Sequence, residues 1–163
     1  MKYRRLTNEE LIPLEKKFIQ FLVANTITAD DWTKMKERRP QQALGLIDIF
    51  SDLIFEESMK KVEYLMYIQP KQIIVYRCGP DIIDMLGLVF DSDSDIDFTK
   101  NSNWFDELKN NHKDIDIVRK QKHYADAREI EVFKLIESGC RITDDVFYKT
   151  FNHHTDLFGT RVA

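Results

Sequence analysis

The chain has 163 residues, of which 43% are hydrophobic, and it contains only five glycines and four prolines. This composition suits one folded domain with a real core and excludes a long flexible or disordered chain. A formal net charge of −4 speaks against a protein that coats nucleic acid over its whole surface. No apolar stretch matches a membrane span or a secretory signal, so we expect a soluble cytoplasmic protein.

Two capping patterns predict the first two helices. Thr7 and Thr28 each precede an acidic residue three positions on and then apolar residues at helical spacing. They predict one helix over about 8–24 and a shorter one over about 28–38. Pro13 removes a backbone donor near the first turn, so the first helix either starts later or bends there.

A third, longer helix is expected over 41–68. Only Gly45 interrupts the helical pattern in this stretch. Its apolar residues fall on one face, and Asp48, Asp52 and Glu56 fall on the opposite face. This acidic face is a candidate surface for a protein partner.

The period of the sequence changes after Pro70. Branched and aromatic residues over 73–76 and 82–90 flank turn residues at 78–81, which predicts a β-hairpin. The further elements expected in chain order are a helix over 103–110, a strand over 115–118, a helix over 126–137, a short strand over 141–143 and a helix over 144–151.

These elements predict an α+β fold in a single domain, residues 1–163. About three helices in residues 1–68 are expected to pack on a small, mostly antiparallel sheet, with two or three further helices in residues 69–163.

The acidic segment Asp91–Asp97 is the one candidate for a hard cation, because oxygen ligands alternate along it. A calcium loop that begins at Asp91 needs glycine at its sixth position and glutamate at its twelfth, where this chain has Ile96 and Ser102. The segment is therefore either a solvated acidic loop or a weak ion site. The four histidines and two cysteines lack the spacing of zinc ligands, so no metal site and no cofactor are predicted.

Catalytic motifs are missing from the sequence. There is no nucleophile elbow, phosphate loop, dinucleotide fingerprint or paired-histidine zinc motif. The carboxylates of Glu56 and Glu57, and those of Asp144 and Asp145, are adjacent rather than convergent. We therefore expect a binding protein rather than an enzyme, with no catalytic residue.

Basic residues gather in three clusters, each of them next to an aromatic residue, which is Tyr3, Trp32 or Tyr124. Cations grouped in this way can bind phosphates, and neighbouring rings can stack on unpaired bases. They can equally offset the negative ends of helices. The candidate nucleic-acid-binding residues are Lys2, Arg4 and Arg5 in the first cluster, Lys34, Lys36, Arg38 and Arg39 in the second, and Arg119, Lys120 and Lys122 in the third.

Five segments of the chain resemble a family of small Bacteroidota proteins of unknown function. The segments are MKYRRLT at 1–7, TITADDW at 26–32, IDIFSDLIF at 47–55, VEYL at 62–65 and FKLIESG at 133–139. The resemblance spans most of the chain and implies no catalytic motif. The resemblance also suggests that this family is the lineage-specific extra protein of the large ribosomal subunit in Bacteroidota.

Two hypotheses follow for the function. The leading one is a non-catalytic accessory protein of translation that binds ribosomal RNA or ribosomal proteins. The acidic balance of the chain favours a peripheral position on the ribosome over a deeply embedded one. The rival is a cytoplasmic protein-interaction module whose partner meets the acidic face of the third helix.

Overall fold

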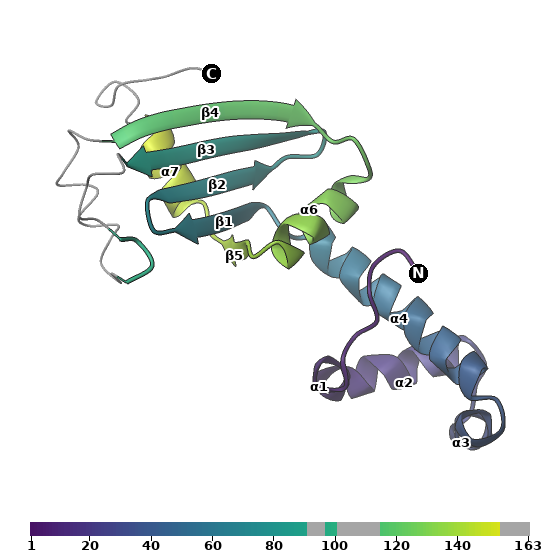
Figure 1. The fold of residues 1–163 in the computed structure, drawn as a ribbon. Helices are drawn as coiled ribbons and strands as arrows, with labels where there is room; N and C mark the ends of the chain where they lie inside the picture. The colour runs from purple at the N-terminus through teal and green to yellow at the C-terminus, as the bar shows by residue number, and fades with distance from the viewer. Residues whose placement is uncertain (91–96, 101–114, 154–163) are drawn as a thin grey trace. The chain divides into compact units, whose positions relative to one another are not determined.

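The structure is a computed structural model that describes residues 1–90, 97–100 and 115–153 (Figure 1). The chain forms two compact units, Met1–Lys60 and Lys61–Ala163. Helices build the first unit, and the second contains a five-stranded antiparallel sheet, so the predicted α+β class is confirmed. The helix expected over 103–110 and residues 91–96 of the acidic segment lie outside the described residues.

The first unit begins with the two predicted caps. Thr7 accepts a hydrogen bond from the Glu10 amide and Thr28 accepts one from the Asp31 amide, and both form complete capping boxes. Pro13 breaks the helix expected over 8–24 into three pieces, because a proline ring and its missing N–H favour a tighter turn there. The helices are α1 (Asn8–Leu11), a 3₁₀ turn (Ile12–Leu14), α2 (Glu15–Ala24), α3 (Ala29–Arg38) and α4 (Pro40–Lys60).

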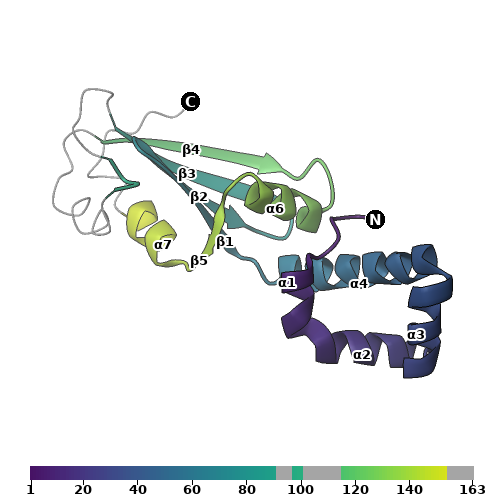
Figure 2. The ribbon, with the colours of Figure 1, turned by 60° about the horizontal axis from the view of Figure 1, so that its bottom comes forward.

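Aromatic side chains hold these helices together. Phe18 of α2 lies 4.9 Å from Phe50 of α4 and 5.3 Å from Trp32 of α3, measured between ring centroids. Phe50 is only 2% exposed. Edge-to-face ring pairs add about 1 kcal/mol each beyond the burial of their area. Figure 2 shows α3 between the ends of α2 and α4.

The third helix is shorter than predicted. It ends at Lys60 instead of continuing to residue 68, and Tyr64–Gln69 forms strand β1. The reason is a hairpin: β1 pairs with β2 (Gln72–Cys78) across a two-residue turn that contains Pro70. The apolar and aromatic residues of β1 fit both the helical and the strand periodicity. The pairing with β2 makes this segment a strand.

The predicted hairpin over 73–90 is confirmed and belongs to a larger sheet. Strand β2 pairs with β3 (Ile82–Phe90), and the strand order is β4-β3-β2-β1-β5, with β5 at Arg141–Thr143. Strand β4 runs over Ile115–His123, five residues past the predicted end at 118. The extension is charged and lies at the sheet edge, where lysine is tolerated, so hydrophobic patterning did not detect it.

The two faces of the sheet carry different helices. On one face, Ile73, Leu88 and Ile117 are completely buried and pack with Phe147 and Phe151 of α7 (Val146–His153). On the opposite face lies α6 (Arg128–Glu137), whose Val132 is fully buried. Figure 1 shows α6 in front of the sheet and α7 behind it. None of the described helices has the length and apolarity that a bilayer crossing needs.

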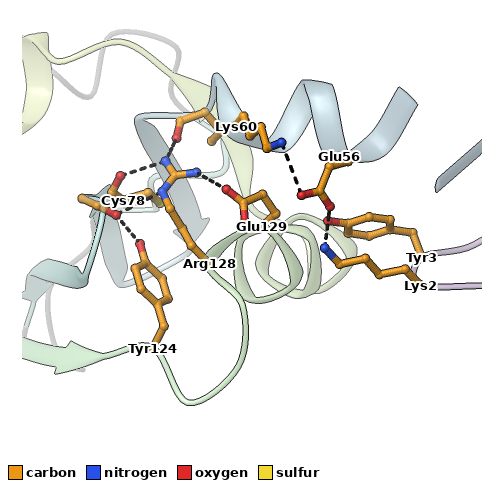
Figure 3. A network of polar contacts seen from close by, with 10 residues as sticks. Lys2, Tyr3, Glu56, Lys60, Cys78, Tyr124, Arg128 and Glu129 are labelled. Atoms are coloured by element: carbon orange, nitrogen blue, oxygen red, sulfur yellow. Dashed lines mark hydrogen bonds and ion pairs between the residues drawn. The ribbon is translucent and has the colours of Figure 1, made fainter. Parts of the chain in front are cut away.

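A partly buried arginine binds the strand ends beside α6. The Arg128 guanidinium donates to the carbonyls of Val62, Cys78 and Gly79, and the Tyr124 hydroxyl also donates to Gly79 (Figure 3). Burial raises the pKa of the Cys78 thiol to about 11, so this thiol is protonated at neutral pH. Arg128 therefore satisfies backbone acceptors where the strands end.

Candidate nucleic-acid interface

The N-terminal segment, residues 1–6, carries the first predicted basic cluster along α4. Arg5 forms a two-pronged ion pair with Asp48, with N–O distances of 2.6 and 2.9 Å. The Lys2 ammonium lies 2.5 Å from the Glu56 carboxylate. Figure 3 draws this ion pair as a dashed line. Arg4 pairs in the same two-pronged way with Glu10, at 2.7 and 2.8 Å. Each cation of this cluster thus meets a carboxylate of the same unit.

Backbone groups of the N-terminal segment bind the same acidic face. The amides of Lys2 and Tyr3 donate to the Asp52 carboxylate at 2.7 and 2.8 Å. The Leu6 amide donates to the buried hydroxyl of Ser51 at 3.1 Å. The Tyr3 hydroxyl donates to Glu56 at 2.7 Å. The acidic face predicted as a partner surface is therefore occupied by the beginning of its own chain.

The pKa shifts of the α4 carboxylates agree with their contacts to the N-terminal segment. The hydrogen bond from Arg5 lowers the pKa of Asp48, and hydrogen bonds from Lys2 and then Tyr3 lower the pKa of Glu56. Opposite charge and donated hydrogen bonds both favour the ionised carboxylate. At neutral pH these carboxylates are charged and matched within the unit.

The second cluster lies at the end of α3 and is exposed. The side chains of Lys34, Lys36, Arg38 and Arg39 are all exposed. Within the part of the chain that the structure describes, Arg38 and Arg39 form no ion pair. The Lys36 ammonium lies 5.9 Å from the centroid of the Trp32 ring, which itself packs on Phe18, so Trp32 is committed to the helical core. This cluster offers cations to a partner and no free ring.

The third cluster is divided by the alternation of strand β4. Arg119 lies opposite Leu86 on the face that α7 covers, whereas Lys120 and Lys122 point to the face of α6. Lys122 pairs with Glu131 of α6 at 2.5 Å. Lys120 and Lys122 border a hollow of about 840 Å³ whose apolar walls include Met85. The three residues therefore do not form one surface.

A family model described as a family of unknown function (DUF6495) matches residues 1–156. The chain belongs to this family. No curated protein and no solved structure matches the chain. The family assigns no activity, so function has to be inferred from the geometry above.

Two charged residues of the sheet are not among the predicted site residues. Arg77 and Asp84 face each other on β2 and β3, and the Asp84 side chain is almost completely buried. The signal was a charge inside each apolar strand, because a charge is rarely buried without a partner. Among the described residues, no group of three or more His, Cys, Asp or Glu side chains is arranged to hold a metal.

Proposed function

We propose that the chain is a non-catalytic accessory protein of translation in the bacterial cytoplasm, bound at the periphery of the large ribosomal subunit. The observation that carries this proposal is the cluster at the end of α3, where four cations lie exposed and the two arginines lack ion-pair partners among the described residues. The resemblance to small Bacteroidota proteins supports the same class.

The α3 cluster has the chemistry to bind RNA phosphates. Guanidinium groups such as those of Arg38 and Arg39 can donate two parallel hydrogen bonds to one phosphate, and lysines add point charge. The N-terminal cluster is neutralised by ion pairs, and the β4 cluster is divided between the two faces of the sheet. The proposed RNA contact is therefore limited to the α3 cluster. A local contact is compatible with an acidic chain that sits at the surface of a ribonucleoprotein.

Co-sedimentation with purified large subunits tests the proposal. The protein should travel with the subunits at low salt and leave them as salt rises, because each neutralised phosphate releases counterions. Four contacts to single-stranded RNA give a slope of about −3 in a plot of log K against log salt. A protein that stays at the top of the gradient at every salt concentration contradicts the proposal.

The rival function, binding to a protein partner, now rests on a different surface. Ile49 and Leu53 lie one turn apart on α4 and are 57% and 45% exposed. An exposed aliphatic pair suits a small apolar contact. Binding that survives nuclease treatment and is lost in an Ile49→Ser, Leu53→Ser variant would favour this rival over RNA contact.

A further inference from the structure

A polar hollow interrupts the apolar sheet face beside α7. Arg77 on β2, Asp84 on β3 and Gln121 on β4 occupy opposed positions in adjacent strands, so their side chains share that face. The hollow has a volume of about 430 Å³, which is the size of a small-molecule site. Its polar lining includes Arg77, Asp84, Arg119, Gln121, Tyr148 and Asn152.

The Asp84 carboxylate has hydrogen-bond partners for both of its oxygens within this hollow. Arg77 donates from Nε to the Asp84 carboxylate at 2.7 Å, and the Gln121 amide donates to its other oxygen. The Arg77 side chain is half exposed, and its guanidinium lies 5.5 Å from the centroid of the Tyr148 ring. The buried carboxylate therefore has its partners, and Arg77 keeps part of its guanidinium open to a ligand.

Arg119 has no carboxylate partner among the described residues. In the same part of the chain, its guanidinium donates to neutral acceptors only, the Asn152 side chain at 2.7 Å and the carbonyls of Phe151 and Asn152 at 3.5 and 3.4 Å. Its Nε atom is buried and has no hydrogen-bond partner within the described residues. A cation with a spare buried donor costs free energy unless an anion meets it. The carboxyl end of α7 supplies only part of that compensation.

We propose that this hollow binds the phosphate group of a small phosphorylated molecule, with Arg119 and Arg77 as the contacts. The number of donors favours phosphate over a carboxylate. Arg77 and Arg119 together exceed Asp84 by one positive charge, and their two guanidinium groups can donate to several oxygens of one anion. A phosphate monoester carries about −1.5 to −2 at neutral pH and offers three strong acceptor oxygens. The site lies in the second unit and does not depend on the α3 cluster or on the function proposed above.

Nuclear magnetic resonance of the whole chain provides a direct test. The Arg119 Nε–H resonance should shift downfield and saturate as ribose 5-phosphate is added, because the unpaired donor gains an acceptor. Inorganic phosphate should give the same shift, and sodium chloride at equal ionic strength should give none. Absence of a saturable shift with both phosphates, or an equal shift with chloride, overturns the proposal.

Variants separate binding from a structural role. Arg119→Met should weaken ribose 5-phosphate binding by about tenfold or more, whereas Lys134→Gln on α6, on the opposite face of the sheet, should change it by less than about twofold. If Arg119→Met fails to fold, the Nε–H titration of the unaltered chain still decides. Unchanged phosphate binding in a folded Arg119→Met variant shows that Arg119 only caps α7. Binding of a dinucleoside monophosphate without binding of ribose 5-phosphate or inorganic phosphate overturns the small-molecule assignment and places an RNA backbone in the hollow.

Discussion

The N-terminal segment and the end of α3 carry similar positive charge and use it differently. In the N-terminal segment, Lys2 and Arg5 each meet a carboxylate of α4 within 3 Å. In α3, Arg38 and Arg39 are exposed and have no ion pair among the described residues. The difference lies in the partners: the acidic residues spaced along α4 face the N-terminal segment and neutralise it. A basic cluster is thus available to a partner only if folding leaves the acidic residues of its own chain elsewhere.

Arg128 differs most from the exposed arginines of α3, because its guanidinium is bound to backbone carbonyls of the sheet. We therefore expect its replacement to have the largest effect on stability. Arg128→Met keeps much of the volume but removes the guanidinium donor from the carbonyls of Val62, Cys78 and Gly79, of which Gly79 keeps the Tyr124 hydroxyl. We expect a loss of about 3 kcal/mol in the free energy of unfolding, measured by urea denaturation. Lys134→Met, which removes an exposed ion pair with Asp126, is the control and should cost less than about 0.5 kcal/mol. Equal losses in the two variants would show that Arg128 is not structural.

The second prediction tests how firmly the N-terminal segment is held. Ser51 is completely buried, accepts from the Leu6 amide at 3.1 Å and donates to the Ile47 carbonyl at 2.7 Å. Ser51→Ala leaves the Leu6 N–H without an acceptor and should cost about 1 to 2 kcal/mol of unfolding free energy. Faster hydrogen exchange at Leu6 checks the cause. Ser58→Ala, on the exposed part of the same helix, should change neither quantity, and a similar loss there would contradict the assignment.

The third prediction separates stability from association. Arg5 and Asp48 are partly exposed, with side-chain exposures of 42% and 28%, so Arg5→Gln should lower the melting temperature only slightly. The association of the Arg5→Gln variant with large ribosomal subunits should stay unchanged. Asp48→Asn should lower the melting temperature by a similar amount, and the double variant should lower it little more. Weakened association in Arg5→Gln alone would mean that Arg5 leaves Asp48 to contact the partner.

The smallest effect concerns acid sensitivity. Hydrogen bonds from Arg4 and then from the Thr7 backbone lower the pKa of Glu10 from 4.5 to about 2. Because the folded pKa lies below the unfolded one, this contribution to stability is complete above about pH 5 and is lost as the pH falls toward 2. Carboxyl titration by nuclear magnetic resonance should show the low value, and Arg4→Gln should raise it toward the ordinary range. A Glu10 that titrates near 4.5 in the unaltered chain contradicts the Arg4 contact.

Local signals in the sequence predicted much of this fold. Thr7, Thr28 and Pro13 act through backbone hydrogen bonds a few residues away, so their effects could be predicted from neighbouring residues alone. Strand β1 and the end of β4 depend on pairing with distant strands, and local hydrophobicity cannot report that pairing. The candidate site shows the same limit. The basic residues were found, but the pairing of Arg5 with Asp48 joins positions 43 residues apart, which only the folded chain brings together.

The central claim is that the α3 cations bind the partner and the N-terminal cations bind the chain itself. Two double variants of equal charge change test it in one co-sedimentation series with large ribosomal subunits. We predict that Arg38→Gln, Arg39→Gln weakens association by about tenfold and lowers the melting temperature by less than about 2 °C, since exposed cations contribute little to stability. Lys2→Gln, Arg5→Gln should keep the association and lower the melting temperature further. Equal association for the α3 variant and the unaltered chain, with loss confined to the N-terminal variant, would contradict the account.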